Sequence, residues 1–449
     1  MPANHIPPQR APALSEVMLA CARAVQAVRS GRSLSDALAA TPAPLRAATQ
    51  AISFHVMRRL GLAAEIKSLL VERTPPNPLF DALLHVSLAL LDTAMEAALP
   101  DAPANTSQEP VYAVHTVVNQ AVRAAETPGM RSYKGLLNAT LRRFTRERPG
   151  ILTQARRNPV AKWNYPLWWI KQLERAYPDQ WQALLHAGDR PGPMTLRVNT
   201  RRASVQEVIE RLAGAGIQSE PVGEAGLVLG HARPVHEIPG FDEGWWSVQD
   251  AAAQQAAVLL RPFDGALVLD ACSAPGGKAA HVLEKARVGL LALDNDEARL
   301  ERVQQNLDRL GLQGDEVRLR CADAAEPGAW WAGRPFDLVL ADVPCTASGV
   351  VRRHPDIRWL RREADIARTA ALQQKIVAAL WKTVKPGGRL LYATCSIFPR
   401  EGEQQAQRFL DMHPDAERLP APGQILPLPD ASGRALYDGF FYALFAKRA

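Results

Sequence analysis

Apolar residues recur every three or four positions along the first third of the chain, a pattern that is typical of amphipathic helices. The pattern predicts helices over residues 15–28, 44–62, 78–99, 111–125 and 134–144. Ser15 is placed to cap the first helix, and Gly61 marks the expected end of the second. We therefore predict an all-α domain over residues 14–150, with a flexible leader over 1–13 before it and a basic, proline-containing linker over 145–162 at its end.

The pattern is mixed over residues 163–240. Helical spacing over 165–177, 179–187 and 204–216 alternates with strand-like segments over 194–200, 217–222 and 226–230. The helix over 204–216 begins at a serine cap and ends at a glycine. These segments predict a small α/β domain between the helical region and the rest of the chain.

From residue 241 to the C-terminus, short apolar runs alternate with helical segments. Strands are predicted over 266–270, 288–294, 316–323, 336–342, 388–396 and 439–448. Such alternation is typical of a Rossmann-like, doubly wound and mostly parallel sheet, and we expect the final strand to be antiparallel. Ligands of this fold bind at the carboxyl ends of the strands. The residues at those ends are Asp270, Asp294, Asp323, Asp342 and Cys395.

The composition is that of a globular protein: 47% of the 449 residues are hydrophobic and 22% are charged. We expect no apolar run to reach the roughly 18 residues of a membrane helix, and the N-terminus lacks the apolar core of a signal peptide, so a cytoplasmic location is expected. The five cysteines are widely spaced and contain no C-x-x-C pair, which argues against a disulfide framework or a metal site. Most of them are expected to be core residues.

The formal net charge of +7 is concentrated in two segments, 141–162 and 352–362. Each segment could be a solvated face or a surface for a polyanion such as RNA. Arginines on such a surface would hold phosphates and set the register of the nucleic acid.

The segment "LDACSAPGGK" (269–278) predicts a strand, a glycine turn and a helix. Such a turn lets the backbone approach a ligand. Walker A spacing fails at Cys272 and Ala279, and no G-x-G-x-x-G is present. Asp294 is placed to accept ribose hydroxyls, and Asp323 lies near an expected adenine, although Asp323 alone could also cap a helix. Together these features favour S-adenosylmethionine. The predicted cofactor contacts are Asp270, Cys272, Ser273, Ala274, Pro275, Gly276, Gly277, Lys278, Asp294, Arg299, Asp323 and Asp342.

Two cysteines follow neighbouring strands of this predicted sheet. Asp342 and Cys345 follow one strand, and Cys395 ends the next long one. C5 of a pyrimidine is a poor nucleophile, but a thiolate that adds at C6 makes C5 reactive toward a methyl donor. Lys278 could favour the thiolate, and Asp342 could hydrogen-bond or protonate N3. The pattern thus predicts covalent methyl transfer to a pyrimidine.

The motifs "DACSAPGGK", "ADVPCTASGVVRRHPDIRW" and "YATCS" resemble those of the RNA cytosine-C5 methyltransferases of the Nop2/Sun family. The resemblance implies that Cys395 is the nucleophile and that Cys345 assists product release, with Lys278 and Asp342 as the further catalytic residues. DNA cytosine methyltransferases are thought to use the cysteine of the P-C motif instead, so the pair favours RNA. Val343 and Thr346 stand where the family often has alanine and serine.

The resemblance extends over nearly all of residues 14–449. "LRVNT", with Arg197 and Asn199, is similar to the RNA-binding extension of the family, and "WWSVQDAAAQQAAVLL" is similar to its entry segment. Residues 14–150 resemble the NusB-like domain of the 16S rRNA enzymes. The resemblance therefore implies methylation of 16S rRNA at cytosine 967 in the numbering of that RNA, by a monomer acting on unassembled or partly assembled RNA.

Alternatives remain at this point. The same chemistry could act on tRNA or another rRNA cytosine, and a NusB-like domain alone would suit a non-enzymatic RNA-binding protein. A small-molecule or protein methyltransferase would not need two thiols. A flipped base could stack on His354 or Trp359, whereas Trp245 and Trp246 are expected in the core.

Overall fold

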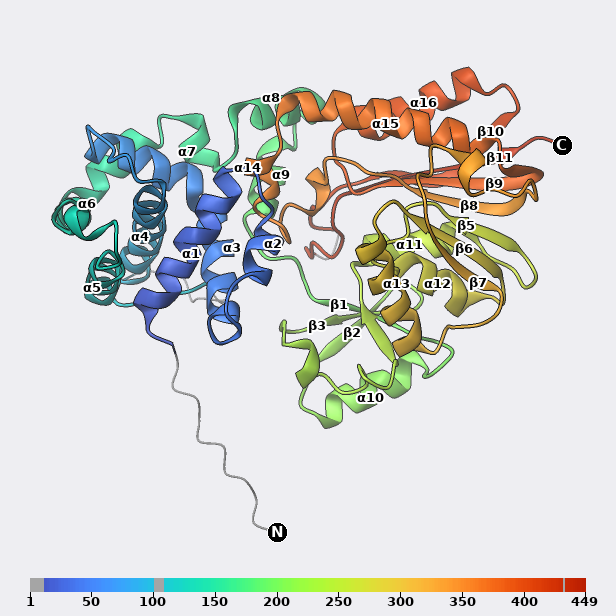
Figure 1. The fold of residues 1–449 in the computed structure, drawn as a ribbon, viewed down its shortest axis with the longest axis horizontal. Coiled ribbons are helices and arrows are strands. Elements are labelled where there is room, and N and C mark those ends of the chain that lie inside the picture. The colour runs from blue at the N-terminus through green and yellow to red at the C-terminus, as the bar shows by residue number, and fades with distance from the viewer. Residues whose placement is uncertain (1–11, 101–108, 431–432) are drawn as a thin grey trace, which may run out of the picture. The chain divides into compact units, whose positions relative to one another are not determined.

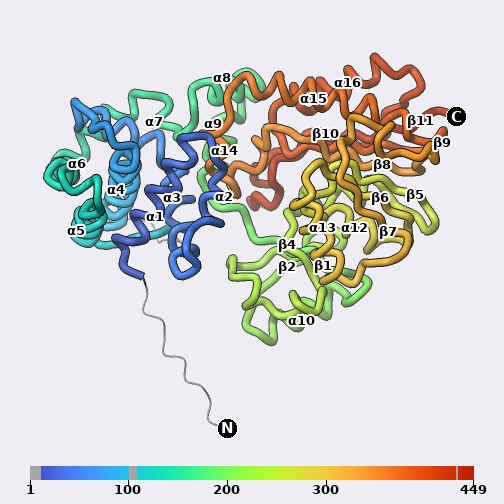
Figure 2. Tube along the Cα trace, in the orientation of Figure 1, coloured from blue at the N-terminus to red at the C-terminus, as the bar shows by residue number. Residues whose placement is uncertain are grey.

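The computed structural model describes residues 12–100, 109–430 and 433–449, so nearly all of the predicted leader lies outside the described residues. The chain forms two compact units. The helical unit comprises the chain up to Gln172 together with His354–Arg361, and the sheet unit comprises Leu173–Arg353 and Arg362–Ala449 (Figures 1 and 2). The first unit is therefore completed by a segment from the second half of the sequence.

The helical unit is built around α4, which contacts α1, α3, α5 and α6. Its helices are α1 (Leu14–Arg29), α2 (Leu34–Ala39), α3 (Ala43–Leu70), α4 (Pro78–Ala97), α5 (Val114–Ala124), α6 (Lys134–Ala155), α7 (Pro159–Trp163) and α14 (Ile357–Leu360), while α8 (Leu167–Ala176) crosses the boundary between the units. The prediction of a helical N-terminal region is confirmed.

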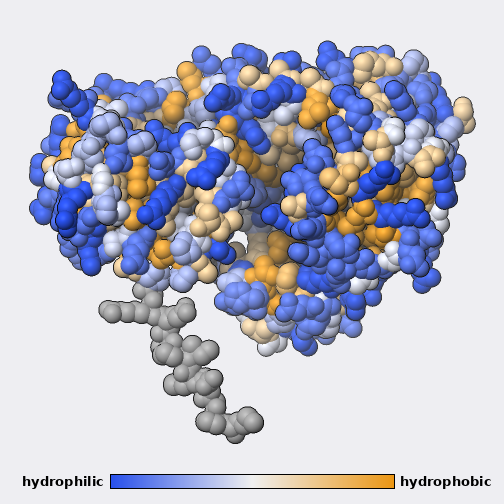
Figure 3. All heavy atoms as spheres, viewed as in Figure 1, coloured by the Kyte–Doolittle hydropathy of each residue, from blue (hydrophilic) through white to orange (hydrophobic). Residues whose placement is uncertain are grey.

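One helix in the described part of the chain, α4, is long and apolar enough to cross a membrane by length and composition, which contradicts the expectation from the sequence. In the structure, 83% of its most apolar window is buried inside the protein. Asp81, His85 and Asp92 on this helix are buried as well. Helix α4 therefore lies at the centre of the apolar core of the helical unit. The face of the molecule drawn in Figure 3 is covered mainly by polar side chains.

Two helix boundaries differ from the predictions. The cap of α1 is Ala13, without a side-chain hydrogen bond, and Ser15 lies inside the helix. Helix α3 continues past Gly61 because the residues beyond it, including Ile66, are buried in the core. A glycine costs a helix only about 1 kcal/mol, which packing of an apolar face outweighs.

The predicted linker over 145–162 is wrong, because α6 continues to Ala155 and α7 follows it. Helix α6 contains Pro149, which removes one backbone hydrogen bond. The buried face of α6 nevertheless keeps its period across the proline, with Phe144 before it and Ile151 and Leu152 after it. Tertiary packing thus overrides the local helix-breaking signal.

The returning segment His354–Arg361 is tied to the helical unit by hydrogen bonds. Asp356 Oδ2 accepts from the backbone N–H of Leu34 at 2.9 Å, and Trp359 Nε1 donates to the carbonyl of Met57 at 2.8 Å. The guanidinium of Arg358, which is fully buried, lies 3.9 Å from the ring centroid of Tyr165. Trp359 and Arg358 therefore serve as structural contacts of the helical unit. The buried Arg358 is not available to phosphates, and stacking of a base on Trp359, one possibility raised by the sequence, stays a prediction.

The sheet unit contains a small antiparallel sheet of order β2-β3-β1-β4. Its elements are α9 (Trp181–Gly188), β1 (Thr195–Val198), α10 (Val205–Gly214), β2 (Ser219–Val222), β3 (Gly226–Leu229) and β4 (Trp246–Val248). Helix α10 begins with a capping box in which Ser204 and Glu207 exchange hydrogen bonds. The sequence did not indicate β4. Trp246 is fully buried, as expected, and donates from Nε1 to the carbonyl of Pro239.

The large sheet has seven strands in the order β10-β11-β9-β8-β5-β6-β7. Its strands are β5 (Leu267–Asp270), β6 (Gly289–Asp294), β7 (Val317–Cys321), β8 (Phe336–Asp342), β9 (Val384–Thr394), β10 (Ala416–Ile425) and β11 (Phe440–Lys447). Strands β5 to β9 run parallel, and β10 and β11 are antiparallel. The doubly wound, mostly parallel prediction is confirmed, but a second antiparallel strand is present. Two prolines and a glycine obscure β10, and prolines are tolerated there because it is an edge strand.

Helices cover both faces of this sheet (Figure 1). Helices α11 (Ala251–Leu260), α12 (Gly277–Lys285) and α13 (Glu297–Leu310) pack on one face, and α15 (Glu363–Trp381) and α16 (Glu403–Met412) pack on the other. Each face has its own apolar core. The carboxyl edge of the parallel strands is left for the site.

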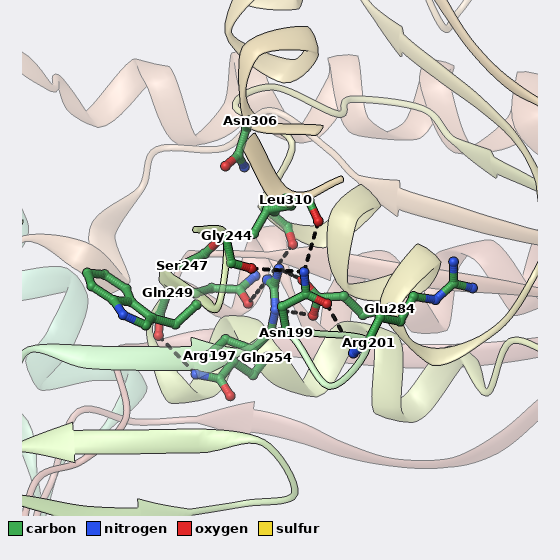
Figure 4. A network of polar contacts seen from close by, with 12 residues as sticks. Arg197, Asn199, Arg201, Gly244, Ser247, Gln249, Gln254, Glu284, Asn306 and Leu310 are labelled. Carbon is green, nitrogen blue, oxygen red and sulfur yellow. Dashed lines mark hydrogen bonds and ion pairs between the residues drawn. The ribbon is translucent and has the colours of Figure 1, made fainter. Parts of the chain in front are cut away.

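A buried polar network joins the small sheet to helices α12 and α13, which cover the large sheet (Figure 4). The guanidinium of Arg197 on β1 donates to both carboxylate oxygens of Glu284 on α12, at 2.8 and 2.7 Å, and to the carbonyl of Gly277 at 2.6 Å. Asn199 donates to the carbonyls of Gly244 and Leu310, each at 3.0 Å. Both Arg197 and Asn199 are fully buried. These two residues therefore hold the small sheet against the glycine loop and against α12 and α13.

Candidate active site

The parallel strands bring four of the predicted side chains to one edge of the sheet. Asp270, Asp294 and Asp342 are the last residues of β5, β6 and β8, and Cys395 directly follows β9. Asp323 lies two residues past the end of β7, at the outer edge of the sheet. The strand order places β8 between β5 and β9, so Asp342 lies between the glycine loop and Cys395.

The glycine loop turns from β5 into α12 through Gly276, whose φ of +93° is in the left-handed region. A Cβ at this position would approach the Cα of Val303 to 3.2 Å and its Cγ1 to 3.0 Å. Both the conformation and the close approach require glycine. The loop can therefore present its backbone at the strand edge only with a glycine at this position.

The loop is held against the next strand by Asp294, which is almost fully buried. Its carboxylate accepts from the backbone N–H groups of Ala274 and Asp296, each at 3.2 Å, and Arg299 lies 3.3 Å from the same carboxylate. Asp323 is exposed and accepts from the N–H of Ala325 at 2.9 Å, a contact within its own turn. Asp294 thus joins the glycine loop to the end of β6, whereas Asp323 lies at the outer edge of the sheet.

Asp270 is buried, and neither of its carboxylate oxygens has a hydrogen-bond partner among the described residues. Burial, together with the nearby charge of Asp342, raises the pKa of Asp270 to about 7. The same two causes, burial first, raise the pKa of Cys272 and keep that thiol protonated. The inner end of the site therefore carries a buried carboxylate that a ligand could satisfy with a hydrogen-bond donor or a positive charge.

Lys278 and Asp342 form a short ion pair, with Lys278 Nζ 2.5 Å from Asp342 Oδ2. Burial favours the neutral amine, but the charge of Asp342 and its hydrogen bond outweigh that effect and raise the pKa of Lys278. The ammonium also lies 5.4 Å from the ring centroid of Phe440 on β11. The lysine is therefore a fixed cation beside the strand end that carries Asp342.

Cys345 Sγ and Cys395 Sγ are 3.4 Å apart, and both thiols are free. The hydrogen bond with Cys395, followed by burial, raises the pKa of Cys345 well above its usual value. Cys345 therefore keeps its proton in this arrangement. The structure brings together the two cysteines that the sequence placed at neighbouring strand ends.

The other cysteines differ in their surroundings. Cys21 is buried in the helical core, as expected, and burial raises its pKa to about 12. Cys321 is exposed at the end of β7, so the interpretation of it as a core residue is wrong. Neither lies at the strand edge that carries Cys345 and Cys395.

Two arginines of the basic segment 352–362 belong to the sheet unit, and both form ion pairs within it. Arg352 and Arg353 bind both oxygens of Asp438, and Arg353 also binds Asp250 at 2.8 Å. Arg352 is only 3% exposed. These two arginines hold the segment that follows Cys345, and the expectation that they hold phosphates is wrong.

Sequence reasoning missed Glu401, which is fully buried and contacts the residues next to both cysteines. The only signal was an acid shortly after the T-C-S motif, and exposed acids are common in such positions. Its burial is visible only in the structure.

The sheet, the glycine loop and the acids at the strand ends define a methyltransferase of Rossmann-like fold that uses a cofactor of the S-adenosylmethionine type. A family model described as "16S rRNA methyltransferase RsmB/F" matches residues 257–446, and an RsmF/B-like ferredoxin-like domain model matches residues 165–236. The chain belongs to the RsmB/F family of ribosomal RNA methyltransferases.

Relatives and solved structures agree with this assignment. The chain is 41% identical over 437 residues to ribosomal RNA small subunit methyltransferase B of Vibrio cholerae, covering 94% of this chain and 95% of that protein. The protein of the same name from Vibrio vulnificus is 44% identical over 343 residues, covering 75% and 79%. The crystal structure of PH0851 is 25% identical with a TM-score of 0.76 over 96% of this chain and 99% of that chain. A methyltransferase homologue from Pyrococcus horikoshii is 29% identical with a TM-score of 0.56, over 64% and 97%.

Proposed function

We propose that this protein transfers a methyl group from S-adenosylmethionine to C5 of a cytosine in 16S rRNA through a covalent adduct with Cys395. The observation that carries the proposal is the pair of free thiols 3.4 Å apart, Cys345 and Cys395, beside the Lys278–Asp342 ion pair. A methyl transfer to oxygen or nitrogen would not need two thiols. In a reaction that proceeds by attack at C6 followed by elimination, one thiol can form the covalent bond and the other can assist its cleavage.

In the proposed reaction, the thiolate of Cys395 adds to C6 of the flipped cytosine, and a bond forms between Sγ and C6. Asp342 hydrogen-bonds to N3 or protonates it, so that the added electron density makes C5 nucleophilic. C5 takes the methyl group and then loses its proton, and the bond between Sγ and C6 breaks. Cys345 lies next to this bond: its protonated thiol can pass a proton to the departing Sγ of Cys395 and then take up the proton that C5 loses, which suits its proposed role in release.

The residues at the strand edge fit the proposed cofactor, whose sulfonium centre supplies the electrophilic methyl group. The partnerless oxygens of Asp270 suit a ligand with donors or positive charge, and Gly276 allows the ligand to approach the backbone. Asp294 is proposed to accept the ribose hydroxyls. The remaining predicted contacts are proposals of the same kind: Cys272, Ser273, Ala274, Pro275, Gly277, Lys278, Arg299, Asp323 and Asp342.

Replacing Asp294 with alanine is expected to weaken binding of S-adenosylmethionine by about 10- to 100-fold, because hydrogen bonds to a charged group contribute about 1.5–3 kcal/mol. The substitution also frees the N–H of Ala274 in the glycine loop. Isothermal titration with S-adenosylmethionine measures the change, and Asp308→Ala on the exposed side of α13 is the control. Unchanged affinity in Asp294→Ala would mean that the ribose is held elsewhere.

The proposed RNA substrate is unassembled or partly assembled 16S rRNA, with cytosine 967 as the target nucleotide and a monomer as the active form. The helical unit is proposed to be the NusB-like RNA-binding domain over 14–150, followed by the extension over 163–240 and the catalytic domain over 241–449. We also propose that the protein acts in the cytoplasm. Six exposed cations on and after α6 support RNA binding there: Arg142, Arg143, Arg146, Arg156, Arg157 and Lys162.

The proposal is tested by trapping the adduct with Cys345→Ala. We expect this variant, mixed with S-adenosylmethionine and protein-free 16S rRNA, to form a protein–RNA adduct that survives a denaturing gel, because release is slowed after Cys395 has attacked. The adduct should be absent from Cys321→Ala, which releases its product, and from the double variant Cys345→Ala/Cys395→Ala. An adduct with tRNA alone would refute the 16S assignment, and no adduct with any RNA would refute the division of tasks between the cysteines.

A further inference from the structure

A buried carboxylate lies behind the two cysteines. Glu401 is fully buried and accepts five hydrogen bonds, all from neutral donors. Its Oε1 accepts from the backbone N–H of Thr346 at 2.9 Å, from Thr369 Oγ1 at 2.6 Å and from Gln373 Nε2 at 3.2 Å. Its Oε2 accepts from Thr346 Oγ1 at 2.5 Å and from Ser396 Oγ at 2.6 Å. One side chain thus collects donors from three separate parts of the chain.

Two of these donors are the sequence neighbours of the cysteines. Thr346 directly follows Cys345, and Ser396 directly follows Cys395. The two loops are otherwise far apart in sequence, and each lies at the end of a different strand. Glu401 therefore joins the loop that carries one thiol to the loop that carries the other, with both of its oxygens in use.

Further contacts link the same two loops on the side of Ser348. Its Oγ lies 2.9 Å from Ser396 Oγ and accepts from the backbone N–H of Ile397 at 2.9 Å. The backbone N–H of Gly349 donates to the carbonyl of Cys395, also at 2.9 Å. These contacts align the loops, but they involve neutral groups on the loops themselves.

The remaining donors to Glu401 come from α15, which is a long helix packed on the sheet. Gln373 on this helix also donates to the carbonyl of Pro344, next to Cys345, at 2.9 Å. Thr369 lies one turn earlier on the same helix. The carboxylate therefore fixes both cysteine loops to an element that is itself held by the core.

The chemical character of Glu401 matters for this arrangement. An ionised carboxylate only accepts hydrogen bonds, so every hydroxyl and amide around it is turned to donate. A buried charge of this kind is tolerated only when donors satisfy it, and the resulting network is rigid. An amide in its place would present two N–H donors to Thr346 and Ser396. These donors would compete with the hydrogen bonds that the two residues donate to Glu401.

We propose that Glu401 is a positioning residue that sets the separation and orientation of Cys345 and Cys395 for methyl transfer. The inference rests on the proposed function, in which Cys395 forms the bond to C6 and Cys345 assists its cleavage. Displacement of a reacting group by about 1 Å can cost about 100-fold in rate. A carboxylate that holds both loops at once protects against that loss.

The first test is Glu401→Gln, which keeps the shape of the side chain, with Glu403→Gln as the matched control. Glu403 is two residues away, and its carboxylate binds Arg418 at the surface. Glu401→Gln is expected to lower kcat for methyl transfer about 10-fold and Glu401→Ala about 100-fold, while the affinity for S-adenosylmethionine stays within about twofold of wild type. Wild-type kcat in Glu401→Gln would overturn the proposal.

A second readout reports on the distance between the thiols and needs no RNA. Diamide is expected to join Cys345 to Cys395 rapidly in the wild type, whose sulfurs are 3.4 Å apart. Peptide mass spectrometry follows this reaction, which should slow about 10-fold in Glu401→Gln and stay unchanged in Glu403→Gln. A lowered kcat with an unchanged rate of disulfide formation would overturn the positioning role, because the loss would then have another cause.

A double-mutant cycle covers the case in which Glu401 variants do not fold. Thr346→Val and Ser396→Ala each remove one hydroxyl donor to Glu401 while the carboxylate stays in place. If Glu401 joins the loops, the effects on kcat are expected to be non-additive, whereas additive effects would overturn the proposal. Failure of the proposed function is seen separately, as a wild-type enzyme that transfers no methyl group to 16S rRNA.

Discussion

Replacing Cys395 with alanine is expected to lower the rate of methyl transfer by about 1,000-fold or more, because no other group in the site can form the bond to C6. Cys345, 3.4 Å away, does not substitute for it, since its raised pKa keeps the thiol protonated. Binding of S-adenosylmethionine should stay within about twofold, because the proposed cofactor contacts lie at or after the ends of β5, β6, β7 and β8 and not on β9.

Single-turnover assays with labelled S-adenosylmethionine and protein-free 16S rRNA measure this loss, and calorimetry measures the cofactor affinity of the same preparations. Cys321→Ala is the matched control, because Cys321 also lies at the carboxyl end of a parallel strand but is exposed at the edge of the sheet. Full activity of Cys395→Ala would show that the adduct forms on another residue.

Replacing Asp342 with asparagine is expected to lower kcat by about 1,000-fold, within the range by which a positioned acid or base accelerates a reaction. The carboxylate, which accepts a hydrogen bond from Lys278, can relay a proton from that ammonium to N3, but an amide cannot. In the wild type the largely buried ammonium of Lys278 lies 2.5 Å from the carboxylate of Asp342. The substitution leaves this ammonium without its counter-charge. The two effects act in the same direction, so this change should be second only to the loss of Cys395.

The matched control for this variant is Asp337→Asn at the other end of the same strand. Asp337 also binds a lysine, Lys385, at 2.9 Å, but at the surface and away from the carboxyl edge. The control should keep nearly full kcat, and thermal unfolding of both variants shows whether either loses its fold. Comparable activity of Asp342→Asn and wild type would remove the aspartate from the proposed reaction.

The sheet of the catalytic region could be predicted because its parallel strands are short apolar runs that end abruptly in acids or a cysteine. Asp270, Asp294 and Asp342 lie at strand ends in the structure, and Cys395 follows the next strand, as the pattern indicated. Burial on both faces makes such strands almost continuously apolar, and this signal survives without any tertiary information.

Elements that depend on packing could not be predicted in the same way. The sequence around Pro149 reads as a linker, yet the buried face of α6 carries the helix through it. Strand β10 has a polar, proline-containing sequence and is a strand only because β11 offers it an edge. The local sequence is therefore a poor guide to helix or strand wherever packing against a neighbouring element determines the conformation.

Charged residues gave the least reliable predictions. Arg197, Arg352 and Arg358 were associated with RNA, but each is buried and bonded inside the protein. Glu401 gave no signal, yet it is the buried acceptor between the two cysteine loops. A sequence shows where charge occurs, but only the tertiary structure shows whether a partner removes it from solvent.

The return of the chain to the helical unit has a consequence for synthesis on the ribosome. Domains usually fold as they emerge, with the N-terminal one first. Here the N–H of Leu34 and the carbonyl of Met57 find their partners only when Asp356 and Trp359 have been made. By then β5, β6, β7 and β8 have all been translated. The last step in building the helical unit therefore coincides with assembly of the catalytic sheet, and the two units are not independent products of successive stretches of translation.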